Sequence, residues 1–322
     1  MTRWAATIRA RAAFREIARH VFAEAGYLEV ETPTLREEVC VDACIDPVVA
    51  AGSFLQPSPE LAMKQLLADE SVAADHPAIW QLGKAFRAGE QGRQHRIEFT
   101  MCEWYRLGDD HQAQMAFTEH FVDALHRSRV SRRPAPPRPY ARIGYYDAMA
   151  HVLGRRIEHA GDEELAELVL AKAAGSLEPL GREATRDDWL NAALALFVEP
   201  WLAQFAACFL VDYPASQAAL ARTRFDAARD LPVAERFELY LADGRGHVVE
   251  VANGYHELTD AAEARRRFEQ ANARRGDPLP LPEHFLAVQD RLPPCSGVAL
   301  GWDRLLMHLL GTDDIATVLT PP

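Results

Sequence analysis

The stretch that most constrains the fold runs from Phe86 to Leu107 and reads FRAGEQGRQHRIEFTMCEWYRL. Its first part, residues 87–96, is charged and contains two glycines, which predicts a loop with no apolar face to bury. Its second part, residues 97–105, alternates and is rich in aromatic and β-branched side chains, which predicts a strand. Residues 78–82, AIWQL, predict the preceding strand. Together they predict a β-hairpin that holds arginines over one end of a sheet.

Arginines at a hairpin tip have two interpretations. A guanidinium fork binds phosphate and carboxylate groups through paired hydrogen bonds. A charged tip is also an ordinary solvated turn, and composition by itself favours that second interpretation. The order of the residues in the stretch, together with other segments of the chain, favours the first.

Three segments, in chain order, resemble the three motifs of the class II aminoacyl-tRNA synthetases. Residues 28–33 (LEVETP) resemble motif 1, residues 86–107 resemble motif 2 in its lysine-enzyme version, and residues 296–305 (SGVALGWDRL) resemble motif 3. Residues 212–221 (DYPASQAALA) and 250–260 (EVANGYHELTD) are most similar to the stand-alone lysyl-synthetase paralogues that attach (R)-β-lysine to a lysine of elongation factor P. The resemblance covers nearly the whole chain.

The resemblance implies an α+β fold, in which helices flank an antiparallel β-sheet. It implies one catalytic domain over residues 1–322, with a mainly helical insertion at about residues 145–209. Because motif 1 begins by residue 28, we expect no anticodon-binding domain and no tRNA partner. The family forms homodimers through motif 1, with a proline at the centre of the interface, so Pro33 predicts a homodimer. Alternatively, Pro33 only ends an edge strand.

Composition is compatible with this class. The 322 residues, 48% apolar and 25% charged, are ordinary for a globular protein with one large core or two modest ones. No run of about 18 apolar residues predicts a membrane span, and the start lacks the apolar core of a signal peptide. Five cysteines without a C-x-x-C pair favour free thiols in the cytoplasm. The net charge of −12 argues against a grip on a large nucleic acid.

The chain lacks a G-x-x-x-x-G-K-[ST] segment, so ATP would not lie on a P-loop. The resemblance implies that ATP binds bent across the sheet, with two catalytic arginines. Arg87 matches the motif 2 arginine that bridges the substrate carboxylate and the α-phosphate, and Arg304 matches the motif 3 arginine near the γ-phosphate. Phe99 would stack under adenine, with Arg304 over its other face. The other implied ATP contacts are Gly89, Glu90, His95, Arg96, Glu250, Val251 and Gly301.

Two carboxylates, Glu238 and Glu250, match those that hold Mg²⁺ between phosphates in the family. Hard oxygen ligands on neighbouring strands suit that ion. Each of them could instead be an exposed strand carboxylate. Adenylate formation requires no general base and no covalent nucleophile, because the work is positioning and charge neutralisation.

For the amino acid, the resemblance assigns Glu60 to the amino group beside the carboxylate, and Glu257 and Tyr105 to the distal ammonium. A buried carboxylate is costly without a cation, which favours a long cationic substrate. Glu60 could instead only complement a helix dipole, because Ser-Pro-Glu is also a helix-start pattern. The remaining implied substrate contacts are Ser58, Pro59, Asn253, Gly254 and Ala299.

The chain departs from the family pattern in several places. Arg96 and Ile97 stand where Asn-Pro is usual, and Glu90 is shifted by one position, so the ATP contacts there are open. Trp302 replaces a smaller aliphatic residue. Ala299 stands where lysyl-tRNA synthetases commonly have glycine, and its methyl group would crowd an α-amino group while clearing a β-amino group. Alternatively, Ala299 is only a strand residue with better propensity than glycine.

The first hypothesis is therefore an ATP- and Mg²⁺-dependent ligase. It would activate (R)-β-lysine or lysine as an adenylate and transfer it to a lysine side chain of elongation factor P. A second hypothesis keeps the chemistry but charges tRNA with a bare catalytic core. A third is a catalytically silent regulatory paralogue. The presence of Arg87, Arg304, Glu238 and Glu250 argues against the third, whereas Arg96 and Ile97 keep it open.

Overall fold

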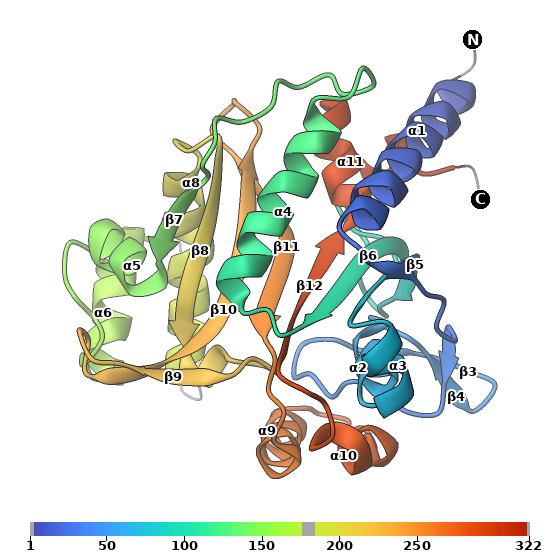
Figure 1. The fold of residues 1–322 in the computed structure, drawn as a ribbon. Coiled ribbons are helices and arrows are strands. Elements are labelled where there is room, and N and C mark those ends of the chain that lie inside the picture. Colours follow the sequence, from blue (N-terminus) through green and yellow to red (C-terminus); the bar gives the residue numbers. More distant parts are fainter. Residues whose placement is uncertain (1–2, 176–183, 321–322) are drawn as a thin grey trace. The chain divides into compact units, whose positions relative to one another are not determined.

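The computed structural model describes residues 3–175 and 184–320 and divides the chain into two compact units (Figure 1). The first unit consists of residues 1–135 and 251–322, and the second of residues 136–250. The second unit covers more of the chain than the insertion expected at residues 145–209, because it also contains strands before and after those helices.

The first unit carries the three segments that resemble synthetase motifs. Its helices are α1 (Arg3–Glu24), α2 (Glu60–Leu67), α3 (Glu70–Asp75), α4 (His111–His126), α9 (Ala261–Ala273), α10 (Glu283–Gln289), α11 (Trp302–Leu310) and the 3₁₀ turn η3 (Ile315–Thr317). Its strands are β1 (Leu28–Glu29), β2 (Leu35–Arg36), β3 (Val48–Ala50), β4 (Ser53–Leu55), β5 (Ala78–Phe86), β6 (Glu98–Leu107) and β12 (Cys295–Gly301), and it contains most of β11 (Val248–His256).

The sheet of this unit has the order β1-β5-β6-β12-β11. β1 pairs with β5 in parallel, and the other neighbours are antiparallel. The β5–β6 register runs from Ala78 opposite Arg106 to Phe86 opposite Glu98, so residues 87–97 form the tip of the hairpin that the sequence predicted. A smaller antiparallel sheet has the order β2-β4-β3. The α+β fold class with an antiparallel-rich sheet is confirmed.

An aromatic core joins the sheet to α1 and α4, which pack against each other. Phe22 of α1 stacks on Trp80 of β5, with ring centroids 4.3 Å apart, and also contacts Trp104 and Phe121 edge-on or tilted. The Trp104 indole donates a 2.7 Å hydrogen bond to the Gln114 side chain, so its polar atom is satisfied inside the core. These contacts fix β6, the motif 2 strand, from one side.

The second unit contains a sheet and a group of helices. Its sheet contains β7 (Ala141–Gly144), β8 (Ala207–Pro214), β9 (Thr223–Asp226) and β10 (Leu231–Ala242), in which β8 pairs with both β7 and β10, and β9 pairs with β10. Its helices are α5 (Tyr145–Leu153), α6 (Asp162–Ala173), α7 (Arg186–Ala193), the π-helix η1 (Leu194–Val198), α8 (Glu199–Leu202) and the 3₁₀ turn η2 (Ala215–Gln217). Phe209 and Phe237 pack edge-to-face between β8 and β10.

In the motif 1 segment, residues 28–33, only Leu28–Glu29 forms a strand. All five cysteines lie in described segments, and all are free thiols. Among the described helices, none is long and apolar enough to cross a membrane.

Candidate active site

The start of α2 carries Glu60, the first of the expected substrate-binding carboxylates, and places it beside β6. Pro59 precedes the helix, and Ser58 accepts a 3.0 Å hydrogen bond from the backbone N–H of Glu60. The same Ser58 hydroxyl donates a 2.7 Å hydrogen bond to Oε1 of Glu103 on β6. The Ser-Pro-Glu pattern therefore does more than begin a helix, because its serine ties Glu60 to a second carboxylate.

Lys64 lies one helical turn after Glu60, a spacing that places both side chains on one face. Its ammonium donates a 2.7 Å hydrogen bond to Oε1 of Glu60 and forms a 2.5 Å ion pair with Oε2 of Glu257. The Lys64 side chain has no solvent exposure and that of Glu257 only 1%. Burial lowers the pKa of Lys64, but the charges of Glu257 and Glu60 outweigh it and raise the pKa above its usual value. Lys64 is therefore a buried cation.

Glu103 completes a group that we name the carboxylate cluster, consisting of Glu60, Glu103 and Glu257. Glu103 is fully buried and accepts hydrogen bonds from Ser58 and, at 3.1 Å, from the Tyr105 hydroxyl. Burial raises its pKa to about 8, with a further contribution from Glu60. Sequence reasoning missed Glu103, although its place two residues before Tyr105 on a strand puts both on one face.

Gly297 on β12 has no side chain, which allows Tyr105 and Glu257 to approach the strand closely. It lies opposite Tyr105 in the antiparallel ladder, and a Cβ atom at this position would lie 2.1 Å from Cε1 of Tyr105 and 2.7 Å from Oε1 of Glu257. A side chain there would displace the tyrosine ring. Tyr105 and Glu257, which the resemblance assigned to one substrate group, are thus brought together at a single glycine.

The remaining expected substrate contacts lie on the neighbouring strands. Ala299 is half-buried and lies opposite Glu103 on β6 and opposite Asn253 on β11, so the three share one face. Asn253 donates to the Tyr255 hydroxyl at 3.1 Å, and its buried Oδ1 has no hydrogen-bond partner in the described part of the chain. Gly254, the next residue, pairs with Val298.

The hairpin tip, residues 87–97, presents cations beside the sheet. The Arg87 guanidinium lies 5.2 Å from the Phe99 ring centroid and 3.4 Å from Oε1 of Glu90. Both charged side chains are partly exposed, at 23% and 32%. Gly89 has a φ of +77°, a conformation that glycine adopts without strain. Arg87 therefore approaches the ring on which adenine was expected to stack.

Arg304, at the start of α11, reaches the same tip. Its Nη2 lies 2.5 Å from Nε2 of His95. Burial, followed by the Arg304 charge, lowers the pKa of His95, so the imidazole is neutral at pH 7 and Nε2 accepts from the guanidinium. Gly301 is the N-terminal cap of α11, and Val251 is buried on β11.

The residue before Arg304 is held by a network that sequence reasoning missed. Asp303 is buried and accepts a 2.6 Å bond from Arg11 of α1 and a 2.7 Å bond from the backbone N–H of Thr100. Arg11 also donates to the Thr100 hydroxyl and to the Val318 carbonyl. The motif 3 helix is thus fixed to β6 and α1 at its first turn.

The two expected magnesium ligands lie in the second unit. Glu238 is buried and accepts hydrogen bonds from the Tyr213 hydroxyl at 2.5 Å, the Tyr240 hydroxyl at 2.7 Å and Arg236 at 2.5 Å. Glu250 is half-buried. Burial, then the charges of Glu238 and Glu250, raise the pKa of Tyr240. The structure therefore places both carboxylates near one tyrosine, with Glu238 already engaged by three donors.

A family model described as tRNA synthetases class II (D, K and N) matches residues 2–322. The chain belongs to this family.

Among its relatives, a Vibrio cholerae serotype O1 protein is 38% identical over 98% of this chain and 94% of its own length. A Pseudoalteromonas translucida protein is 36% identical over 98% and 94%, and one from Salmonella gallinarum is 37% identical over 96% and 92%. All three relatives are named elongation factor P–(R)-β-lysine ligase.

Two departures from the usual class II sequence have a local explanation. The Arg96 guanidinium turns back onto its own loop, where it donates to the carbonyls of His95, at 2.8 Å, and of Gly92. It thus holds the hairpin tip together in the place of the missing Asn-Pro. Trp302 is fully buried at the start of α11, so the large side chain fills core volume.

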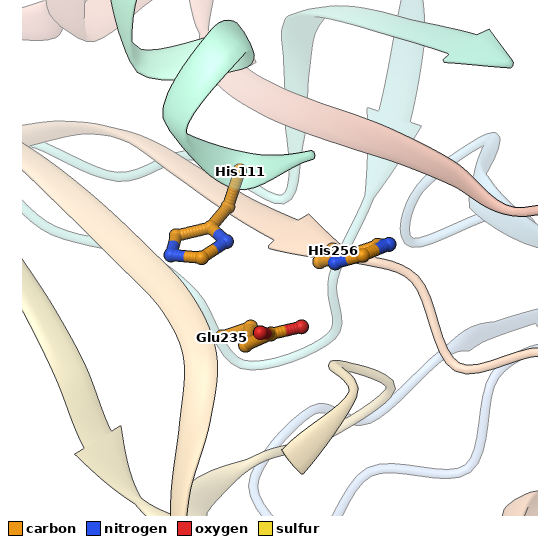
Figure 2. A group of neighbouring side chains, drawn as sticks. All are labelled: His111, Glu235 and His256. Carbon is orange, nitrogen blue, oxygen red and sulfur yellow. The ribbon is translucent and has the colours of Figure 1, made fainter. Parts of the chain in front are cut away.

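A further pair of titratable side chains lies in the first unit of this class II synthetase. His111 begins α4 and His256 ends β11 (Figure 2), and their ring centroids lie 6.5 Å apart with 26° between the ring planes. The third residue labelled in that figure, Glu235, belongs to β10 of the second unit. Sequence reasoning did not identify the histidines, because they are far apart in the chain and form no motif.

Proposed function

We propose that this protein is an ATP-dependent ligase that activates (R)-β-lysine or lysine as an aminoacyl adenylate and transfers it to a lysine side chain of elongation factor P. The observation that carries this proposal is the carboxylate cluster. The cluster holds three carboxylates and one cation: the buried Lys64 ammonium contacts Glu60 and Glu257, and Ser58 joins Glu103 to Glu60, so the fully ionised cluster has two negative charges in excess.

An excess of buried negative charge selects the ligand. Buried carboxylates are stable as anions only when cations or hydrogen-bond donors compensate them. An amino acid of the lysine type brings two ammonium groups, which matches the excess, whereas a neutral side chain brings only one. Without a ligand, Glu103 compensates by holding a proton, in agreement with its raised pKa. Glu60, Glu257 and Tyr105 supply the contacts, with Ser58, Pro59, Asn253, Gly254 and Ala299 around them.

We assign activation to the region between the hairpin tip and this cluster, where the Arg87 side chain donates to the carbonyl of Pro57, the residue before Ser58, at 3.4 Å. One carboxylate oxygen of the amino acid attacks the α-phosphorus of ATP, the bond to the β-phosphate oxygen breaks, and pyrophosphate leaves. Both reacting groups are anionic, so fixed guanidinium groups lower the barrier by neutralising charge. We assign Arg87 to the carboxylate and α-phosphate, Arg304 to the γ-phosphate and Phe99 to adenine. Further ATP contacts are Gly89, Glu90, His95, Arg96, Glu250, Val251 and Gly301.

Magnesium would neutralise phosphate charge and orient the pyrophosphate leaving group. The donor set fits only in part. Glu250 offers a half-buried carboxylate, whereas three donors already occupy Glu238, which leaves little room for an ion without loss of a hydrogen bond. The assignment of Glu238 and Glu250 to Mg²⁺ stays a prediction.

Transfer completes the proposed reaction. The neutral ε-amine of the acceptor lysine attacks the adenylate carbonyl, an amide bond forms, AMP leaves, and the amine loses a proton. Support for elongation factor P as acceptor comes from the names of the relatives, which share more than a third of their residues with this chain over nearly its full length. We propose no tRNA acceptor and a cytoplasmic location, where a translation factor is found.

A homodimer is also part of the proposal. Apolar side chains near motif 1 are exposed in the single chain, among them Ile8 at 51%, Leu28 at 41% and Leu35 at 48%. A second copy of the chain would cover such residues. Sedimentation equilibrium should give twice the mass of 35.9 kDa, and a monomer at micromolar concentration would contradict this part.

The decisive experiment is intact-mass spectrometry of elongation factor P after incubation with the enzyme, ATP and each lysine isomer. We expect a mass increase of one lysyl unit on the factor and none on tRNA in a parallel reaction. Pyrophosphate exchange should require a lysine-type amino acid but no tRNA. Comparable charging of tRNA would support the bare-core alternative, and absence of exchange with every cationic amino acid would support a silent paralogue.

A further inference from the structure

Lys64 lies in the middle of the carboxylate cluster, although no substrate contact is assigned to it. Its ammonium contacts Glu60 on its own helix and Glu257 after β11, at 2.7 and 2.5 Å. It also lies 5.9 Å from the centroid of the Tyr105 ring. The side chain therefore touches the groups that the proposed function gives to the two ends of the amino acid.

Lys64 is required at this position for its charge and not for its volume. The flanking residues Met63 and Leu67 belong to a buried apolar group that also contains Tyr105. A methionine or leucine in place of Lys64 would fill this environment without the cost of desolvating an ammonium. Burying a cation is justified only by the carboxylates that it compensates.

We propose that Lys64 is a positioning residue that sets how many positive charges the substrate must bring. This inference rests on the proposed function. Lys64 permanently neutralises one of the three carboxylates and holds Glu60 and Glu257 in place. In the free protein Glu103 holds a proton, and in the complex an amino acid with two ammonium groups replaces that proton and compensates the other two carboxylates. A substrate with one ammonium leaves one of these carboxylates without a cation, and loss of Lys64 has the same consequence for lysine.

The proposal can be tested because the cation of Lys64 and the anion of Glu257 can be removed separately or together. We would compare the wild type, Lys64→Met, Glu257→Gln and the double variant Lys64→Met/Glu257→Gln. Amino-acid KM and kcat come from pyrophosphate exchange, and Kd for the same amino acids comes from titration calorimetry with an unreactive ATP analogue. Calorimetry measures selection by the cluster even if activation is absent, so a failure of the proposed function is distinguished from a failure of this inference.

For Lys64→Met we expect KM and Kd for lysine or β-lysine to rise by about 30-fold or more, with a smaller change in kcat, because a buried charge loses its partner. The double variant removes one charge of each sign and should bind lysine several-fold more tightly than Lys64→Met. The proposal would be overturned if the double variant bound lysine more weakly than Lys64→Met, or if its loss of affinity equalled the product of the losses in the two single variants. Either result would mean that Lys64 acts through packing.

A second readout does not require Lys64→Met to fold. In Glu257→Gln the lysine remains, and the cluster then needs only one ammonium from the substrate. Norleucine, which has the chain length of lysine without its distal amine, should gain at least about ten-fold relative to lysine in this variant. An unchanged ratio would overturn the proposal. The control is Lys84→Met, the same substitution at a half-exposed lysine paired with Glu98, which should leave both ratios unchanged.

Discussion

The carboxylate cluster and the hairpin tip belong to the same unit, yet they are built in opposite ways. The cluster consists of side chains that are buried or nearly so, held by contacts of 2.5–2.7 Å that involve Lys64 and Ser58. At the tip, Arg87 and Glu90 are partly exposed and 3.4 Å apart, and the pair between Arg93 and Asp313 is largely exposed.

This difference indicates what each region does before the ligands arrive. In the cluster, the charges are already paired or protonated, so the amino-acid end is organised in the free protein. Exposed and loosely formed ion pairs contribute little to stability. The guanidinium of Arg87 can therefore exchange Glu90 for phosphate and carboxylate oxygens at small cost. Substitutions at the tip should change the chemistry and leave the fold intact, whereas substitutions in the cluster should change both.

The largest effect is expected from removal of Arg87, in the tip, or of Arg304, which reaches the tip from α11. Arg87→Ala and Arg304→Ala should each lower kcat for pyrophosphate exchange by about 10²–10³-fold, on the order of 3 kcal/mol of transition-state stabilisation. The midpoint of thermal unfolding should change little for Arg87→Ala. Arg93→Ala, in the same tip but paired outward with Asp313, is the control and should keep its activity. Near-normal rates in Arg87→Ala would show that the motif has been placed wrongly.

The next largest effect should come from pH and should appear at the cluster only. Burial raises the pKa of Glu103 to about 8, so below that pH the free protein holds a proton that a bound ammonium must displace. The value of kcat/KM for the amino acid should therefore fall with decreasing pH, by about ten-fold per unit when one proton competes, while KM for ATP follows it weakly.

The sign for stability is the reverse. A carboxyl group whose pKa is higher in the folded than in the unfolded protein favours folding while protonated, and this contribution is lost as pH rises towards 8. Bound lysine should restore the loss. Glu103→Gln should reduce the slope of both profiles between pH 6 and about 8, and the slope that remains belongs to Glu257, whose pKa burial raises to about 7. A wild-type kcat/KM that is independent of pH in this range would contradict the raised pKa.

Much of the first unit could be predicted from sequence. The hairpin was predicted from its charged tip between two strands rich in apolar residues, and the structure confirms it. These elements were predictable because periodicity and turn residues are local signals. The shortening of β1 to Leu28–Glu29 could not be predicted, since strand length depends on the partner strand, here β5.

The site was predicted less completely. Glu60, Tyr105 and Glu257 were identified from the resemblance of their segments to synthetase motifs. The structure brings the three side chains together. Lys64 was overlooked, because a lysine four residues after a glutamate is normally a solvent-exposed helix pair, and only its burial distinguishes it. For the same reason nothing in the sequence of α1 indicates that Arg11 contacts Asp303, which lies 292 residues away.

A matched pair of glycine substitutions sharpens the comparison between the two regions. Gly297→Ala places a methyl group 2.1 Å from the Tyr105 ring, so the ring has to move or the strands have to separate. Overpacking of this kind costs about 1–3 kcal/mol of folding free energy. We expect a lower unfolding midpoint and a higher amino-acid KM. Gly92→Ala at the tip meets nothing within 4 Å and should change neither quantity. Equal effects of the two substitutions would remove the distinction between cluster and tip.

The smallest effect concerns the choice between lysine isomers. Ala299 lies between Glu103 and Asn253 on neighbouring strands, so its methyl group borders the cluster on the side of the substrate backbone. An α-amino group would lie close to this methyl, whereas a β-amino group, one carbon further along, would clear it and still reach Glu60. A difference of one methyl group in a binding site is worth about 1–3 kcal/mol.

Ala299→Gly should therefore raise kcat/KM for α-lysine relative to β-lysine by about ten-fold, without a change in KM for ATP, because the tip is untouched. Pyrophosphate exchange with each isomer, measured side by side, gives this ratio. Glycine has lower strand propensity, so a small loss of stability is expected in any case and does not bear on the choice of isomer. If the ratio is unchanged while stability falls, Ala299 serves only the strand, and the preference between isomers has to arise from the placement of Glu60 relative to Arg87.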